Sequence, residues 1–275
     1  MATDRVSNFT ASLAHRHLRK TSVGLSFTMA QLASGKRVQS AKDDAAALAI
    51  GARLGAEVGG LRQARVNAGQ ASSMLQVADG GLARTGDLLG RMKTLAVQAG
   101  NGALGATERG AINKEFQALS SEVGRIAADT DFGGTRLLDG SSSGITAKVG
   151  TGVDPAADDL AVALPDTTQA GLGIGSLDVS SKAGADAALN ALGAAIDTLQ
   201  TARSDIGASQ NRLDFAAASA ATTIENTEAA RSSLIDLDVA AATSRLADRK
   251  VLMQSGTSML KAANNQSRAY LKLLV

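Results

Sequence analysis

The stretch LGAEVGGLRQARVNAGQASSMLQVADGGLARTGDLLGRMKTLA, residues 54–96, repeats a small or large aliphatic residue at every seventh position. The row runs without a slip through Leu54, Leu61, Ala68, Leu75, Leu82, Leu89 and Ala96. Because this spacing places the side chains in one narrow stripe, it indicates a helix that packs lengthwise against another helix. The pattern predicts a single helix from about Ala41 to Gly100, about 90 Å long at the standard rise.

The second half of the chain has the same period. One row comprises Leu192, Leu199, Ile206, Leu213, Ala220, Thr227 and Leu234, and a companion row comprises Leu189, Ile196, Arg203, Gln210, Ala217, Ile224 and Arg231. A second long helix is therefore expected. The predicted fold class is mainly α, a coiled coil or bundle of long helices.

The two chain ends also carry rows spaced by seven. The N-terminal row is Ala11, Leu18, Leu25 and Leu32, and the C-terminal row is Leu246, Met253, Leu260, Ser267 and Leu274. Amphipathic terminal helices gain little stability in isolation, so each needs a partner for its apolar stripe. We expect the termini to pair with each other, and their exposed position favours assembly with further copies.

Many glycines lie inside the first long helix, and each costs about 1 kcal/mol relative to Ala. They are Gly51, Gly55, Gly59, Gly60, Gly69, Gly80, Gly81, Gly86 and Gly90. Close approach of a neighbouring element would offset this cost. Otherwise a break is expected near Gly80 and Gly81.

The segment between the helical halves differs in composition. Residues 137–175 hold both prolines, many glycines and two short alternating runs, 145–149 and 160–164. This pattern predicts a β-hairpin within loops. A shorter helix, about Thr107–Asp129, is expected before it.

Composition narrows the functional classes. The chain has no Cys, which excludes disulfides, thiolate metal sites and a Cys nucleophile. Aromatic residues are only 2%, which disfavours a roomy ligand pocket. Residues 1–20 lack the apolar core of a secretory signal, and no run of about 18 apolar residues occurs. We therefore expect neither a membrane span nor export by the general secretory route.

The charge is unevenly distributed. Residues 1–42 carry seven Lys and Arg against one acidic residue, and residues 236–275 carry six against three. Basic ends can bind nucleic acid or anionic lipid, but no aromatic residues interleave the charges as a stacking platform would require. We expect a solvated basic face, with no nucleic-acid or membrane partner. A basic coiled-coil module that binds either one remains the alternative.

The adjacent carboxylates Asp43 and Asp44 could belong to an acid/base or metal site. Ser40 and Asp43 fit a capping box at the start of the long helix instead, where the helix dipole favours negative charge. His15 and His17 fall in another expected helix and on different faces, and no phosphate-loop, HExxH or GxSxG motif occurs. We expect no enzyme activity, no cofactor and no metal.

Several stretches resemble bacterial flagellin, the filament subunit of the flagellum. They are LASGKRVQSAKDDAAALAI (32–50), LLGRMKTLAVQAGN (88–101), INKEFQALSSEVGRIAADTDFGGTRLLDG (112–140), IGASQNRLDFA (206–216), ENTEAARSSLIDLDV (225–239) and QSGTSMLKAAN (254–264). The resemblance covers roughly residues 1–140 and 189–275. Only about 40 residues separate these two parts, so it implies a short form without extra outer domains.

The resemblance implies that the chain polymerises into an extracellular filament for motility, after export in an unfolded state through the flagellar apparatus. Residues 1–42 with 236–275 would form an inner coiled-coil domain, and residues 43–235 an outer helical-bundle domain with the hairpin. Implied partners are further copies or other flagellins, hook-associated and cap proteins, and the export apparatus or a chaperone. A hook-associated junction protein of the same fold is the alternative.

Residue roles follow from position. The inner seam is assigned to Leu18, Leu25, Leu32, Leu246, Met253, Leu260 and Leu274. Polar subunit contacts are assigned to Asp43, Asp44, Arg91, Glu115, Arg231, Asp236 and Asp238. The family's innate-immune receptor contact maps to Arg91, Leu95 and Glu115, although Thr94 stands where an acidic residue is usual. Ser141, Ser142, Ser143 and Thr146 are candidates for O-linked glycosylation, or ordinary turn residues.

Overall fold

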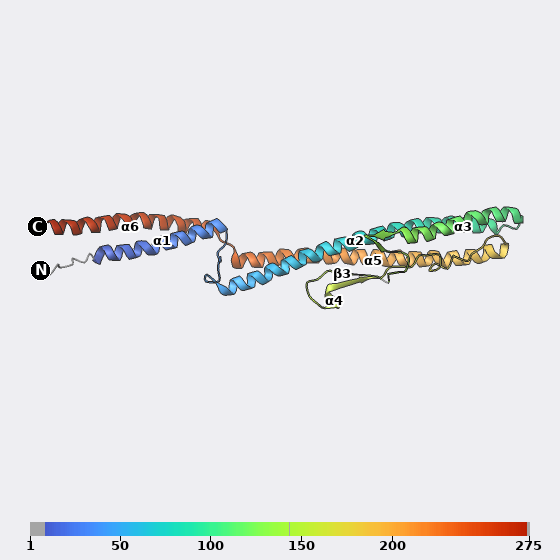
Figure 1. The fold of residues 1–275 in the computed structure, drawn as a ribbon, viewed down its shortest axis with the longest axis horizontal. Helices are drawn as coiled ribbons and strands as arrows, with labels where there is room; N and C mark the ends of the chain where they lie inside the picture. Colours follow the sequence, from blue (N-terminus) through green and yellow to red (C-terminus); the bar gives the residue numbers. More distant parts are fainter. Residues whose placement is uncertain (1–8, 143, 274–275) are drawn as a thin grey trace. The chain divides into compact units, whose positions relative to one another are not determined.

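The computed structural model describes residues 9–142 and 144–273 (Figure 1). Long helices dominate it. The helices are α1 (Phe9–Ser34), α2 (Ala45–Ala99), α3 (Ala106–Asp129), α4 (Pro155–Asp158), α5 (Lys182–Ile235) and α6 (Val239–Leu273). The strands are β1 (Asp131–Phe132), β2 (Thr135–Arg136), β3 (Ile145–Lys148) and β4 (Asp159–Val162). The mainly α fold class with a small hairpin region is confirmed.

The chain divides into two compact units. One comprises residues 1–56 with 226–275, and the other comprises residues 57–225. The first unit holds α1 and α6, which lie side by side, so the expected pairing of the chain ends is present. The second unit holds most of α2 and α5, together with α3 and all four strands.

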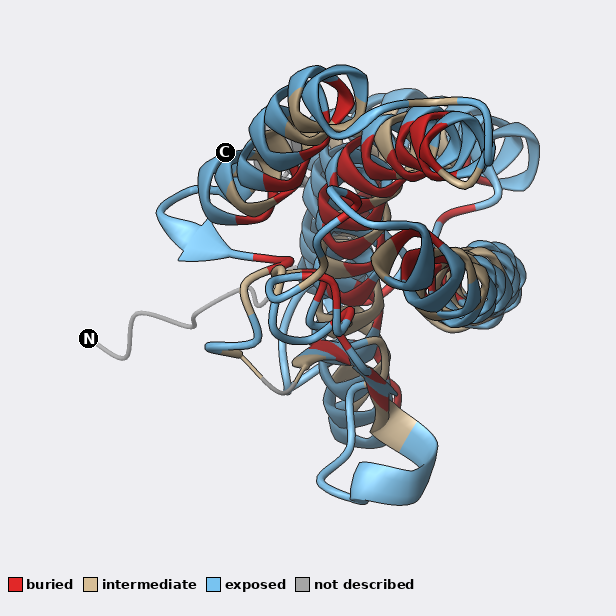
Figure 2. Cartoon of the chain, turned by 90° about the vertical axis from the view of Figure 1, so that its right-hand side faces the viewer, coloured by how far each residue is buried: buried red, intermediate tan, exposed pale blue. Residues whose placement is uncertain are grey.

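The core of the second unit follows the heptad rows. Leu75, Leu82 and Leu89 of α2 and Leu192 and Leu199 of α5 are each at most 1% exposed. The largest buried side chain from α3 belongs to Phe116. Buried residues line the faces that the helices turn toward one another, and the outward faces are exposed (Figure 2). The seven-residue period therefore marks the core correctly.

Two antiparallel hairpins follow α3. In the first, β1 pairs with β2 across Gly133 and Gly134, whose φ angles of 59° and 85° suit glycine. In the second, Ile145 pairs with Val162 and Lys148 with Asp159. Ala147, Leu160 and Val162 turn inward and join the helical core. The predicted hairpin is present, and its buried side anchors it to the bundle.

Helix α2 begins later than the sequence predicts. Residues 40–43 form turns, and the helix starts at Ala45 because Asp44 caps it: the Ala47 N–H donates to Asp44 Oδ1 at 2.9 Å. The expected start near Ala41 is wrong by one turn. Asp43 still accepts from the Ser40 N–H at 3.0 Å, so the Ser40–Asp43 contact forms within the connector instead of at the helix end.

The helix also continues through its glycines, so the break considered near Gly80 and Gly81 is absent. A Cβ at Gly81 would lie 2.7 Å from Leu138 Cδ1, and one at Gly51 would lie 2.1 Å from Ile235 Cδ1. At these positions glycine permits close packing. Gly80, in contrast, has no such neighbour within 4 Å.

Candidate functional site

The α1–α6 pair is held by a seam of partly buried aliphatic side chains. The residues assigned to it are all half-buried: Leu18, Leu25, Leu32, Leu246, Met253 and Leu260. The helices run in opposite directions and approach closely, since a Cβ at Gly256 would lie 3.2 Å from Leu18 Cδ1. The assigned Leu274 lies outside the described residues.

A second apolar stripe lies on the face of α1 that points away from α6. Its members are Phe9, Leu13, Val23 and Phe27, with exposed fractions between 41% and 70%. Their spacing places them on one side of the helix, together with Arg16 and Lys20. On α6, Leu252 and Met259 are seven residues apart and likewise exposed, and Val251 is exposed on another side of the helix. Each helix thus covers one apolar stripe with its neighbour and leaves another uncovered.

Polar groups interrupt the interface between α1 and α6. The Arg249 guanidinium reaches across from α6 and donates from Nη1 to the Gly24 carbonyl oxygen and to Thr28 Oγ1. Thr28 is 2% exposed. The sequence prediction missed this cluster. The signal for it was a second seven-spaced row on each helix, which holds Ala14, Thr21 and Thr28 on α1 and Ala242, Arg249, Gly256 and Ala263 on α6.

The segment between α1 and α2 binds the last residues of α5 and the segment that follows them. The Arg37 N–H donates to the Ile235 carbonyl at 2.7 Å, and the Leu237 N–H donates to the Gly35 carbonyl at 3.0 Å. The Arg37 guanidinium also donates to the Leu234 carbonyl at 2.5 Å. These bonds join the two chain segments at the end of the helix pair where the chain leaves α1 and enters α6.

Three of the assigned polar contact residues accept hydrogen bonds within the chain, two of them as helix caps. Asp44 caps α2, and Asp238 caps α6 by accepting from the Ala241 N–H at 3.0 Å. Asp43 accepts from the N–H groups of Gln39 and Ser40 and from Ser40 Oγ. Desolvation raises the pKa of Asp43, but these donors outweigh it and hold the pKa below its usual value.

Two further assigned residues, Arg91 of α2 and Glu115 of α3, form an ion pair. Arg91 Nη2 lies 2.6 Å from Glu115 Oε1, and both side chains are about half exposed, at 54% and 47%. Screening by solvent keeps such a pair weak, typically below about 1 kcal/mol. Arg231 and Asp236 both line a polar groove at the end of α5, together with Glu228 and Ser232.

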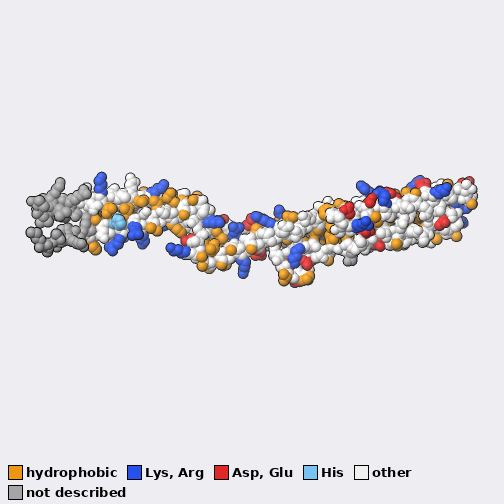
Figure 3. Space-filling view, viewed as in Figure 1, with side chains coloured by type: hydrophobic (Ala, Val, Ile, Leu, Met, Phe, Trp, Pro, Cys, Tyr) orange, Lys and Arg blue, Asp and Glu red, His pale blue; other side chains and the backbone are white. Residues whose placement is uncertain are grey.

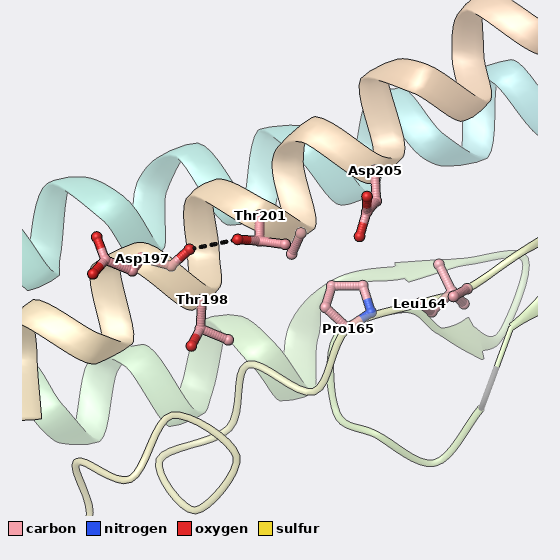
Figure 4. A pocket seen from close by; sticks show the side chains of 8 residues that line it. Leu164, Pro165, Asp197, Thr198, Thr201 and Asp205 are labelled. Carbon is pink, nitrogen blue, oxygen red and sulfur yellow. Dashed lines mark hydrogen bonds between the residues drawn. The ribbon is translucent and has the colours of Figure 1, made fainter.

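A groove of about 440 Å³ in the second unit lies between α5 and the chain that follows β4 (Figure 4). Leu164 and Pro165 form one wall, and Asp197, Thr201 and Asp205 line the other. Asp197 and Asp205 are eight residues apart on one helix, about 12 Å along its axis, too far to act jointly on one atom. The groove offers no nucleophile–base pair, and the described residues contain no metal-binding group of three His, Cys, Asp or Glu.

Comparison with known proteins supplies the family. A model of the bacterial flagellin N-terminal helical region matches residues 6–143, and one of the bacterial flagellin C-terminal helical region matches residues 189–274. The chain belongs to the bacterial flagellin family. It is a structural subunit of the flagellar filament, and its location is extracellular.

Relatives match this flagellin over nearly its whole length. The "Flagellar filament 33 kDa core protein" of Treponema phagedenis is 33% identical over 280 residues, covering 97% of this chain and 98% of the relative. A flagellin of Halalkalibacterium halodurans is 32% identical over 267 residues with the same coverage. Flagellin A of Vibrio cholerae is 29% identical over a longer alignment of 372 residues. These lengths identify the chain as a short-form flagellin.

Solved structures agree with the fold. The crystal structure of Bacillus cereus flagellin matches with a TM-score of 0.51 and 29% identity, covering 56% of this chain and 88% of that one. A putative flagellar hook-associated protein from Vibrio parahaemolyticus matches with a TM-score of 0.59 and 17% identity, covering 70% and 100%. Among the described residues of this flagellin, no helix is both long and apolar enough to span a bilayer.

The remaining assigned residues of this flagellin differ in accessibility. Arg91 and Glu115 are exposed, but Leu95 is 2% exposed and belongs to the core. Of the candidate glycosylation residues, Ser141 and Thr146 are exposed and Ser142 is half-buried, while Ser143 lies outside the described residues. Ser141 Oγ donates to Asp139 Oδ1 at 2.5 Å, which fits the alternative of an ordinary turn residue.

Proposed function

We propose that the α1–α6 pair is the element through which this flagellin polymerises into the filament. The observation that carries the proposal is the uncovered apolar stripe on each helix, in addition to the seam between them. In this proposal residues 1–42 with 236–275 form the inner coiled-coil domain and residues 43–235 form the outer domain. The stripe of one copy would be buried by neighbouring copies.

Burial of these stripes would couple folding to assembly. A fully buried Phe or Val side chain contributes about 1.5–3 kcal/mol relative to the exposed state. Phe9 and Val23 are 70% and 66% exposed in the single chain, so most of this free energy is available only on association. A helix pair that leaves apolar side chains exposed in the single chain also suits export in an unfolded state, which we include in the proposal.

Polar contacts between subunits would add specificity. Asp236 and Asp238 are exposed, and Arg231 is half-buried in the polar groove near them. Asp43 and Asp44 each retain carboxylate lone pairs beyond their capping bonds, since a carboxylate accepts about four hydrogen bonds. We propose that these residues, together with Arg91 and Glu115, contact neighbouring subunits.

We also propose the further partners and roles that membership of the flagellin family implies. Hook-associated and cap proteins would meet the filament ends, other flagellins could co-assemble, and the export apparatus or a chaperone would bind the chain before assembly. We propose no enzymatic activity. A host receptor would meet Arg91 and Glu115 at the surface, with Leu95 supporting them from the core. Ser141, Ser142, Ser143 and Thr146 stay predicted glycosylation residues.

The double variant Val23→Ser, Phe27→Ser tests the role of the uncovered apolar stripe on α1. We expect it to keep the helicity of the wild-type chain and to lose elongation of filament seeds, because both side chains point away from α6. Val153→Ser is the matched control, since Val153 is 95% exposed on the hairpin loop. Electron microscopy of seeded filaments gives the readout. Normal elongation by the double variant would contradict the proposal.

Deletion of residues 236–275 tests the helix pair as a whole. The truncated chain should retain most of the helicity contributed by α2, α3 and α5 and should fail to elongate seeds.

The alternative function is that of a junction protein with the same fold. The similarity to the hook-associated structure supports the shared fold and not the function. This alternative predicts that the full-length chain binds seed ends without extending them, so filament length against time distinguishes the two functions.

A further inference from the structure

The aliphatic seam between α1 and α6 does not by itself select one alignment. Leu18, Leu25 and Leu32 recur every seven residues on α1, and Leu246, Met253 and Leu260 do so on α6. Sliding one helix past the other by seven residues would again place large aliphatic side chains opposite one another. Such near-degenerate alignments are a general hazard of regular heptad seams, and a buried polar residue commonly removes it.

Arg249 supplies a contact that does depend on alignment. Its Nη1 donates to two acceptors one helical turn apart, the Gly24 carbonyl oxygen and Thr28 Oγ1. Thr28 Oγ1 in turn donates to the Gly24 carbonyl at 3.0 Å. The guanidinium lies close to the α1 backbone, because a Cβ at Gly24 would be 3.2 Å from Arg249 Cζ. The site thus requires a residue without a side chain, followed four positions later by a hydroxyl.

Shifted alignments lack this combination. A displacement of seven residues in one direction would place Arg249 beside His17 and Thr21, where the His17 side chain occupies the space that Gly24 leaves open. The opposite displacement would place it beside Gln31 and Gly35, and Gly35 lies past the end of α1. The first shift would bring the His17 side chain against the guanidinium, and the second would leave the guanidinium without a hydroxyl acceptor; either change is costly for a partly buried charge.

We propose that Arg249, seated against Gly24 and Thr28, fixes the register in which α1 and α6 pair. Leu18 against Gly256 provides a second, steric fit in the same alignment. The inference goes beyond assembly, because it concerns which residues face each other within one chain. The uncovered stripes of α1 and α6 then keep a fixed axial offset, which every neighbouring copy must match.

The test is a distance measurement across the pair. The chain has no Cys, so Ser12→Cys and Ser244→Cys introduce unique spin-label sites, both exposed. Given the Leu18–Gly256 contact, residue 262 lies opposite Ser12, and Ser244 is 18 residues away from it. Their axial separation is therefore about 27 Å, and a slip of one heptad changes it by about 10 Å. Pulsed electron paramagnetic resonance resolves this difference.

Arg249→Met keeps a long side chain and removes the guanidinium, and Lys250→Met is the matched control because Lys250 is exposed on the same helix. Measurements use filaments in which labelled chains are diluted with unlabelled chains of the same variant, and frozen solutions of unassembled chain. We expect one native distance for the wild type and Lys250→Met, and a second population displaced by about 10 Å for Arg249→Met.

Two results would overturn the proposal. If Arg249→Met retains only the native distance, the register is set elsewhere. If it loses all defined distances without a displaced population, Arg249 contributes stability and not alignment. Filament formation is scored separately by electron microscopy, so a failure of assembly is distinguishable from a failure of the register assignment.

Discussion

Asp43 shows how one carboxylate organises the connector before α2. It accepts hydrogen bonds from the N–H groups of Gln39 and Ser40, at 3.1 and 3.0 Å, and from Ser40 Oγ at 3.0 Å. Only the ionised form accepts all of these well. The donors overcome partial desolvation and lower the pKa of Asp43 from the ordinary 3.8.

The lowered pKa implies a direction for acid sensitivity. The folded chain binds its proton at Asp43 less readily than the unfolded chain, so this contribution to stability is complete above the ordinary pKa. It is lost as the pH falls from about 4 through the lowered value. We predict that Asp43→Asn, which keeps an acceptor but does not titrate, loses less stability than the wild type between pH 7 and pH 3.

Urea unfolding of the full chain at both pH values measures this difference. Asp248→Asn is the control, because Asp248 is an exposed carboxylate on α6 far along the chain from the connector. It should lose as much stability on acidification as the wild type. Equal losses for wild type and Asp43→Asn would show that the connector does not contribute to the acid response.

Within helix α2, two adjacent glycines have opposite surroundings. A Cβ at Gly81 would lie 2.7 Å from Leu138 Cδ1 and 2.8 Å from Thr130 Oγ1, and Leu138 is fully buried. A Cβ at Gly80 meets nothing within 4 Å. We predict that Gly80→Ala stabilises the chain by up to about 1 kcal/mol, the ordinary helix-propensity gain.

Gly81→Ala should destabilise the chain despite the same gain in propensity, because overpacking a full core typically costs about 1–3 kcal/mol. Thermal unfolding followed by circular dichroism compares the two variants directly. Each variant serves as the control for the other, because both add one methyl group to the same turn of α2. Stabilisation by both would mean that Leu138 moves aside freely, and the close packing would then not explain the glycine.

Much of the helical architecture could be predicted from the seven-residue rows, because those rows mark the buried face wherever two long helices pack along their length. The alternating runs likewise predicted the β3–β4 hairpin. The start of α2 was missed by one turn because Ser40–Asp43 and Asp44 both offer cap chemistry, and only tertiary structure decides between them. The polar contact at Arg249 was missed because it depends on how two distant segments align.

The two compact units of the chain carry opposite charges. Residues 1–56 with 226–275 contain 15 Lys and Arg against 7 Asp and Glu, a formal charge of +8. Residues 57–225 contain 13 against 19, a charge of −6. On the face drawn in Figure 3, Lys and Arg predominate over α1 and α6, and both signs mix along the longer helices. The net charge of +2 therefore conceals a strongly polarised subunit.

This polarity predicts how assembly responds to salt. If copies associate with like units adjacent, as the proposed inner domain requires, the +8 units repel and added salt screens the repulsion; the screening length falls from about 30 Å at 0.01 M to about 10 Å at 0.1 M. We predict that seeded elongation is faster at 0.15 M than at 0.01 M NaCl. Light scattering gives the rates.

Charge variants decide which of the two units causes the salt dependence of elongation. Arg16→Gln with Lys20→Gln removes two charges from the outward face of α1 and should reduce the salt dependence, since less repulsion remains to be screened. Arg65→Gln with Arg84→Gln removes two exposed charges from the acidic unit and should not reduce it. If salt instead slows the wild type, then units of opposite charge are neighbours in the filament, and like units cannot be the main contacts along it.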